Sequence, residues 1–211
     1  TNSIKENIKK TRKFYRIYRG GYITMNKTVN VKNITLISMG IALNVVGAFI
    51  ALNLRLPIYL DSIGTILIAC MLGPKYAVIT GVGGSLVSGM TFDIYSLYFA
   101  PVQITTGYLA GLMYKKDMLK GVKTPLGTFI FTLPTSIISA TIAAFLFGGV
   151  TSSGSSYIVQ ILSHFNVPIV VGVFVTQVFT DYADKFLAVV LVGIVVNSMP
   201  KALKTSMTTN K

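Results

Sequence analysis

Six predominantly apolar stretches divide the sequence, and each is at or near the length that crosses a lipid bilayer. A helix needs about 20 mostly apolar residues to span a hydrocarbon core about 30 Å thick. Apolar residues make up 52% of the chain and charged residues only 12%, which argues against a basic nucleic-acid-binding domain and against a disordered chain. We therefore predict an all-α integral membrane protein with six transmembrane helices. The predicted spans are residues 34–54, 58–72, 76–91, 97–114, 126–147 and a last one that ends at Met199.

The region between the fifth and the last span is less regular. Serine, threonine and glycine predict a loop over residues 151–156, and residues 157–165 favour a short surface helix. Residues 166–168 interrupt the pattern, because proline fixes φ and lacks an N–H. At this point residues 169–180 can belong either to the last span or to a separate re-entrant helix.

Basic residues indicate which ends of the spans face the cytoplasm, because cytoplasmic loops carry an excess of Lys and Arg. Seventeen of the 19 lie before the first span, between the second and third, between the fourth and fifth, or in the tail. The exceptions are Arg55, on the other side, and Lys185, within the last span. We predict that both termini are cytoplasmic, with a basic leader at residues 1–30, a membrane domain at 31–200 and a basic tail at 201–211.

Small residues recur at helical spacing, which lets helices approach closely in a bilayer. In the first span Gly40, Asn44 and Gly47 fall on one stripe, and Ser38 and Ala42 fall on a neighbouring one. The second pair lies near the predicted cytoplasmic end. We predict that it forms a docking face for a partner membrane subunit, with packing inside this chain as the alternative.

Polar side chains gather at one predicted depth within the bilayer. At about 1.5 Å per residue, Lys185 lies roughly 21 Å from Met199, and Gln103 falls at a similar depth. Ionisable groups inside a membrane are costly, and they mark candidate functional sites. Apolar walls with a few placed polar groups are typical of a small-ligand pocket. The candidates are Asp61, Gln103, Gln177, Asp181 and Lys185, with Tyr59, Tyr95, Tyr98 and Tyr108 as aromatic walls.

The same residues also have purely structural interpretations. Lys185 can form an ion pair with Asp181 or Asp184 that only neutralises itself. Asp61 can cap the second span, since Asp is a favoured N-cap residue. The tyrosines can form an ordinary aromatic belt at the membrane interface.

Sequence motifs for ATP binding and for catalysis are absent. The chain has no G-x-x-x-x-G-K-[ST], no G-x-S-x-G and no H-E-x-x-H sequence, so neither a P-loop nor the common hydrolase and zinc-protease sites are expected. One Cys and one His also leave too few ligands for a structural zinc site. We expect a protein that is not an enzyme and that holds no cofactor or metal of its own.

Four stretches are similar to segments of a known family. Residues 56–64 (LPIYLDSIG) and 72–74 (LGP) are similar to one of its branches, and residues 184–195 (DKFLAVVLVGIV) to the last-helix signature of many members. Residues 38–42 (SMGIA) stand where members carry an AxxxA-type docking motif, with Ser in place of the first Ala. Together these stretches resemble the substrate-capture (S) component of energy-coupling-factor (ECF) vitamin transporters, over roughly residues 30–200.

The resemblance implies a multi-pass protein of a bacterial plasma membrane that binds a vitamin. It implies assembly with a coupling membrane protein (the T component) and two cytoplasmic ATPases, which would hold the ATP and Mg²⁺. It places the pocket between the later helices and the loop joining the first two, which adds Arg55 to the candidate substrate-binding residues. The branch looks most like the pantothenate type. Lys185 or Arg55 would then pair with the carboxylate of pantothenate. Hydroxymethylpyrimidine or folate would suit the same groups.

A second class of function stays open, namely a self-sufficient proton-coupled secondary carrier. Asp61, Asp181 or Asp184 would then be the proton site. Transport by this chain alone, abolished by an uncoupler, would favour the carrier. A membrane enzyme would need a catalytic cluster, and the sequence offers no nucleophile–base pair that would serve.

Overall fold

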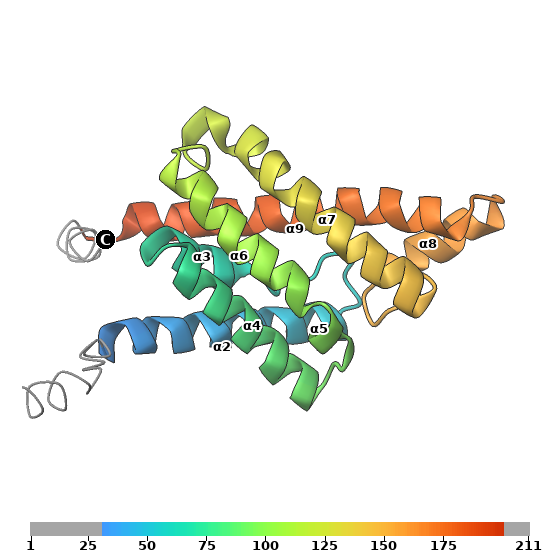
Figure 1. The fold of residues 1–211 in the computed structure, drawn as a ribbon, viewed down its shortest axis with the longest axis horizontal. Coiled ribbons are helices and arrows are strands. Elements are labelled where there is room, and N and C mark those ends of the chain that lie inside the picture. Colours follow the sequence, from blue (N-terminus) through green and yellow to red (C-terminus); the bar gives the residue numbers. More distant parts are fainter. Residues whose placement is uncertain (1–30, 201–211) are drawn as a thin grey trace, which may run out of the picture. The chain divides into compact units, whose positions relative to one another are not determined.

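The computed structural model describes residues 31–200, and every regular element within them is a helix (Figure 1). The predicted leader at 1–30 and tail at 201–211 lie outside the described residues. The packing below is that of residues 35–200, which belong to one of the two compact units of the chain. In chain order the elements are α2 (Val31–Asn53), α3 (Ile63–Met71), α4 (Pro74–Thr91), α5 (Tyr95–Tyr98), α6 (Ala100–Lys115), a 3-10 turn (Gly121–Lys123), α7 (Thr124–Phe147), α8 (Ser155–His164) and α9 (Ile169–Ser198).

Proline and glycine define several of these helix ends. Pro74, Pro101 and Pro125 lie in the first turns of α4, α6 and α7, where a missing N–H costs nothing and the fixed φ favours the helix. Gly148 ends α7 at a φ of 58°, the left-handed conformation that glycine adopts without strain. The predicted all-α architecture is therefore confirmed, with local sequence setting its boundaries.

Two of the predicted spans differ from the observed helices, and one open question is resolved. The second span, predicted at 58–72, becomes helical only at Ile63, because the residues before it form a loop tied to α9. The fourth span, predicted at 97–114, is divided into α5 and α6, because Pro101 cannot donate the hydrogen bond that would continue a helix from Leu97. Residues 169–180, left open by the sequence, are part of the 30-residue helix α9. The short surface helix predicted after the loop is α8.

The face of α2 that packs against the other helices consists of small residues. Gly40, Asn44 and Gly47 are buried, as their shared stripe predicts. A Cβ on Gly47 would overlap the backbone carbonyl of Leu60, and one on Gly64 would overlap that of Gly40. Glycine at these positions therefore allows α2 to contact α3 and the preceding loop backbone to backbone.

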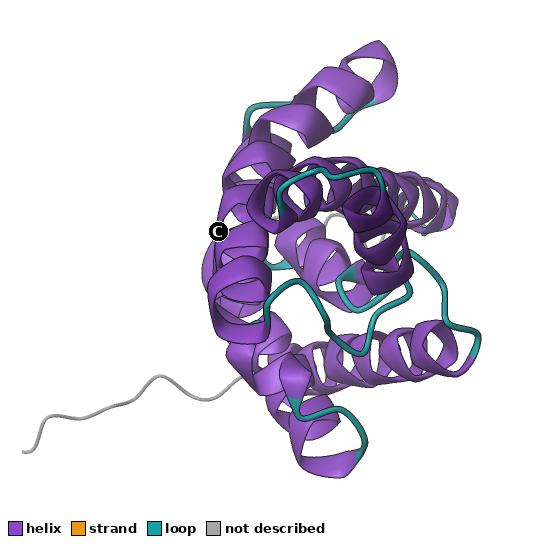
Figure 2. Cartoon of the chain, turned by 90° about the vertical axis from the view of Figure 1, so that its right-hand side faces the viewer, coloured by secondary structure: helices purple, strands orange, loops and turns teal. Residues whose placement is uncertain are grey.

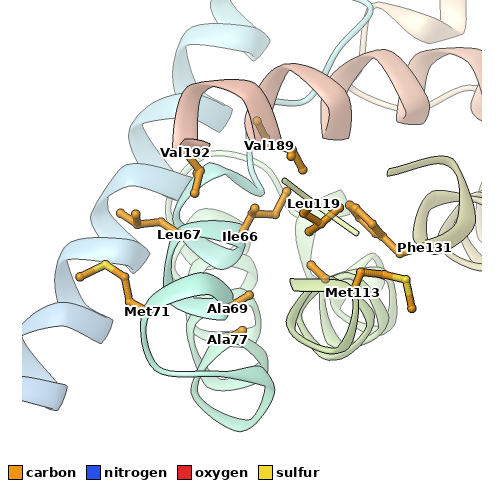
Figure 3. Packing of buried hydrophobic residues seen from close by; sticks show 12 residues of the cluster. Ile66, Leu67, Ala69, Met71, Ala77, Met113, Leu119, Phe131, Val189 and Val192 are labelled. Atoms are coloured by element: carbon orange, nitrogen blue, oxygen red, sulfur yellow. The ribbon is translucent and has the colours of Figure 1, made fainter. Parts of the chain in front are cut away.

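The main hydrophobic core lies where α3 meets α4, α6, α7 and α9 (Figure 3). Smaller apolar contacts join α7, α8 and α9 in a second cluster around Val173. Figure 2, in which the end that carries α8 faces the reader, shows loops grouped among the helix ends there. The labelled core residues are Ile66, Leu67, Ala69, Met71, Ala77, Met113, Leu119, Phe131, Val189 and Val192.

Two helical segments of the described chain have the length and the hydropathy of membrane spans, Val31–Asn53 and Gly121–Phe147. The longest helix, α9, interrupts its apolar sequence with Asp181, Asp184 and Lys185, all of them buried. These charges face the interior of the protein, as ionisable groups in membrane helices do.

Candidate functional site

A cavity of about 60 Å³ lies under the α2–α3 loop, between the ends of several helices. One water molecule needs roughly 10–15 Å³ on the same measure, so the cavity has room for several water-sized groups. We call it the Asp181 cavity. Its lining consists of Ala48, Ala51, Leu52, Leu56, Ile58, Tyr59, Asp61, Asp93, Tyr95, Ser96, Phe99, Val102, Gln103, Ser139, Thr151, Ser152, Ser153, Asp181 and Lys185.

One face of α9 forms the base of this site. Gln177, Asp181 and Lys185 follow one another at intervals of four residues, which places them on the same side of the helix. All three are buried, and Asp181 and Lys185 line the cavity directly. The spacing that the sequence predicts is thus realised in one uninterrupted helix.

Asp184 ties the α2–α3 loop to α9. Its Oδ1 accepts a hydrogen bond from the backbone N–H of Leu60 at 2.7 Å, and its Oδ2 accepts one from the Ser62 hydroxyl at 3.3 Å. The Lys185 ammonium also donates to Oδ2, at 3.1 Å. Of the two ion pairs considered for Lys185, the one with Asp184 is therefore present. Asp184 acts as an anchor for the loop and lies outside the lining.

Tyr59 connects that loop to three further elements. Its hydroxyl donates to Gln177 Oε1 at 3.0 Å and lies 3.2 Å from the Ser155 hydroxyl at the start of α8. Gln177 in turn donates to the Ser139 hydroxyl of α7 at 3.0 Å. The Lys185 ammonium lies 6.0 Å from the centre of the Tyr59 ring, within cation–π range. Gln177 is not part of the cavity lining, and it contributes to the site by holding the Tyr59 hydroxyl.

A second polar network supports the α6 side. Gln103 donates to the backbone carbonyl of Asp61 at 3.3 Å and accepts from the Thr65 hydroxyl at 3.1 Å. Asn44 donates to that hydroxyl at 2.8 Å and accepts from the N–H of Gly64 at 2.7 Å. The sequence placed Asn44 on a packing stripe and did not indicate this role. Buried polar groups need hydrogen-bond partners. The amide of Asn44 inside an apolar span could therefore have indicated a buried hydrogen-bond network.

Two carboxylates at the cavity keep an oxygen without a hydrogen-bond partner among the described residues. They are Oδ1 of Asp61 and Oδ2 of Asp181. The interpretation of Asp61 as the cap of the second span is wrong, because the N-cap position of α3 is Ser62. The described residues contain no group of three His, Cys, Asp or Glu side chains placed to hold a metal ion.

Besides Gln177, three candidate residues lie away from the lining. Arg55 donates to the Tyr157 hydroxyl at 2.8 Å on an exposed surface. Tyr98 is 51% exposed and packs edge-on against Phe147, and Tyr108 is also 51% exposed. The structure does not bring these three side chains to the cavity, and the exposure of both tyrosines fits the alternative of an aromatic belt.

Several lining residues are not among the candidates predicted from the sequence. Asp93 lies between α4 and α5, where the Ser96 hydroxyl donates to it at 3.0 Å. Ser139 faces the cavity from α7, and Thr151 from the loop after it. Asp93 could have been found, since it is one of only six acidic residues in the chain. Small hydroxyl residues such as Ser139 give no comparable signal, because they occur throughout membrane helices.

A family model described as the substrate-specific component of ECF transporters matches residues 32–208. The chain belongs to this family. Its members are integral membrane proteins and transport subunits, not catalysts. Comparison with curated proteins and with solved structures gives no significant match.

Membership of the ECF substrate-specific components confirms the family resemblance and the role of substrate capture. It implies a small vitamin as substrate and an ECF complex that contains a T component and ATPases. The Asp181 cavity combines apolar and aromatic walls with a few buried polar groups, a composition typical of small-ligand pockets.

Proposed function

We propose that this chain captures a vitamin or a vitamin precursor in the Asp181 cavity and delivers it to an ATP-driven ECF importer. The observation that carries the proposal is the convergence of Asp61, Gln103, Asp181 and Lys185 on one cavity in a chain of this family. The two partner ATPases would bind ATP and Mg²⁺, and this chain would contribute substrate binding only.

The test is vitamin uptake by cells that express the chain with and without the T component and the ATPases. We expect accumulation only with the complete set, and loss of accumulation when ATP hydrolysis is blocked. The competing secondary carrier also finds support in the buried carboxylates Asp61 and Asp181. Uptake by the chain alone that an uncoupler abolishes would establish the carrier and refute the subunit.

The exposed side of α2 supports a docking face for the T component. Ser38 and Ala42 are both exposed. They lie on the side of the helix opposite the buried Gly40, Asn44 and Gly47, and not on the neighbouring stripe expected from the sequence. Packing inside the described chain therefore leaves this pair of small residues uncovered. Close helix contact in a membrane favours such residues, and we propose that the T component packs there.

The basic residues support the proposed orientation, with both termini and the α6–α7 loop on the cytoplasmic side of a bacterial plasma membrane. The Asp181 cavity lies toward the opposite ends of α6 and α7, under loops that this orientation places outside the cell. A substrate would then bind from the exterior, as an importer requires.

Pantothenate is the substrate suggested by the resemblance of residues 56–64 to one branch of the family. In that interpretation the ammonium of Lys185 would bind the carboxylate of the vitamin. The measurement that decides is native mass spectrometry of the small molecule that accompanies the purified chain. A mass other than that of pantothenate would refute this choice without affecting the capture role.

A further inference from the structure

Acidic residues are concentrated at the Asp181 cavity. The chain has 19 basic and only 6 acidic residues, and Asp61, Asp93 and Asp181 line this one cavity. Asp184 lies directly behind them in α9, bonded to Leu60. A strongly basic protein thus places four of its six acidic residues around a single site, where they outnumber the one lysine in the lining.

The basic residue in the lining already has its partners. Lys185 donates to Asp184 at 3.1 Å and lies over the ring of Tyr59. Its charge therefore offsets that of Asp184, which anchors the loop. Arg55, the other cation considered for the substrate, is engaged with Tyr157 outside the lining. An incoming carboxylate would meet only one ammonium in this lining, that of Lys185, whose charge is already paired with Asp184.

Two carboxylates that line the cavity lack, within the described part of the chain, a hydrogen-bond partner for one of their oxygens. Asp181 is 1% exposed, and its Oδ2 has no hydrogen-bond partner among the described residues, like Oδ1 of Asp61. A buried carboxylate without a partner costs free energy that a bound cation or an N–H donor removes. A bound anion would instead add like-charge repulsion. Both oxygens thus favour a ligand with donor groups or positive charge.

The remaining walls indicate what kind of cation fits. Tyr59, Tyr95 and Phe99 line the cavity, and aromatic rings attract cations through their faces and pack against flat apolar groups. The described residues provide no cluster that would hold a metal ion. The cavity therefore suits an organic cation with a ring, and the carboxylates suit its nitrogen atoms.

We propose that the substrate is a nitrogen heterocycle that presents a positive charge or amino groups to Asp61 and Asp181, and that it is not a carboxylate such as pantothenate. This inference rests on the proposed function, since it specifies the substrate class of the same site.

The test is isothermal titration calorimetry on the purified, detergent-solubilised chain with three probes at equal concentrations. Two are nitrogen heterocycles, thiamine as a cation and hydroxymethylpyrimidine as an aminopyrimidine, and the third is anionic pantothenate. We expect at least one heterocycle to bind and pantothenate not to bind. Asp181→Asn keeps the shape of the side chain and removes its charge, so affinity for the heterocycle should fall about tenfold or more.

Asp117→Asn is the matched control. Asp117 is exposed in the α6–α7 loop and forms an ion pair with Lys120 at 2.6 Å. The hydrogen bond from Lys120 lowers the pKa of the Asp117 carboxyl. The same change of charge at this distant position should leave heterocycle affinity unchanged. Asp61→Asn provides a second cavity variant with the same expected direction, should Asp181→Asn not fold.

Three results would overturn the inference: binding of pantothenate, binding of neither heterocycle, or unchanged heterocycle affinity in the folded cavity variants. Failure of the proposed function gives a different result, since it is measured by co-purification with the T component and the ATPases and by ATP-dependent uptake. A chain that assembles and imports pantothenate would retain the function and refute the substrate class. A chain that never assembles would refute the function, whichever probe it binds.

Discussion

Lys185 donates a hydrogen bond of 3.1 Å to its neighbour Asp184, and both side chains are almost completely buried. Because Asp184 also accepts from the backbone of Leu60, this pair controls where the α2–α3 loop lies on α9. That loop carries Tyr59 and Asp61 into the cavity. The position of the candidate binding residues therefore depends on an ion pair that lies beneath them.

Replacing Lys185 with Met should destabilise the protein by about 3–5 kcal/mol, because it leaves a buried carboxylate without its counter-charge. Substrate binding should weaken as well, since the loop loses its anchor, while association with the T component should persist. Thermal unfolding in detergent measures the first effect. The double variant Asp184→Asn/Lys185→Met should recover part of the lost stability, and equal losses in the single and double variants would contradict the argument.

Asn44→Ala should lower the free energy of unfolding by about 2–3 kcal/mol. The substitution removes the donor to the Thr65 hydroxyl and the acceptor for the N–H of Gly64, and it leaves buried groups unsatisfied. The matched control is Asn53→Ala, since Asn53 bonds only within its own helix on an exposed surface, and its loss should stay within about 0.5 kcal/mol. Similar unfolding midpoints for the two variants would argue against the α2–α3 network.

Gly154→Ala should weaken the closure of the α7–α8 loop over the cavity. Gly154 donates to the backbone carbonyl of Leu56 at 3.2 Å, and a Cβ there would overlap the carbonyl oxygen of Arg55. We expect faster ligand dissociation, measured by stopped-flow fluorescence or filter binding. Gly193→Ala is the control, because its Cβ meets no atom within 4 Å, and dissociation should not change. A Gly154 variant that releases ligand at the normal rate would rule out this contact as a closure.

Ser38→Leu and Ala42→Leu should reduce co-purification with the T component and leave ligand affinity intact. Each replaces a small exposed residue with a bulky one on the proposed docking face of α2. The control Leu43→Phe enlarges an exposed residue that lies about 100° around the helix from Ala42 and about 140° from Ser38, where we expect no effect on assembly. If the docking variants and Lys185→Met impaired binding and assembly to the same extent, the two sites would not be separate.

Hydrophobic length and residue spacing predicted the helical architecture and the α9 face well. Apolar stretches predicted α2, α4 and α7 well, because each of these helices is long and largely regular. The four-residue spacing of Gln177, Asp181 and Lys185 reported a shared face for the same reason. Both patterns involve residues that are close in the sequence, so the predictions do not depend on how distant parts of the chain pack.

The loop before α3 and the partner of Lys185 could not be predicted in this way. Residues 58–62 are apolar enough to continue a span, but Leu60 has a φ of 52° and its N–H bonds to Asp184 instead of to a helix. This contact joins residues 124 positions apart. Only the folded chain brings such groups together, and it also selects Asp184 rather than Asp181 as the ion-pair partner of Lys185.

Asp184 holds the loop from beneath, whereas Asp61 and Asp181 line the cavity, so the proposed site divides anchoring and recognition between different carboxylates. The selectivity of the site can therefore be re-engineered at the two recognition positions while the anchor is kept. A transporter scaffold divided in this way is open to evolutionary diversification of its cargo without loss of its fold.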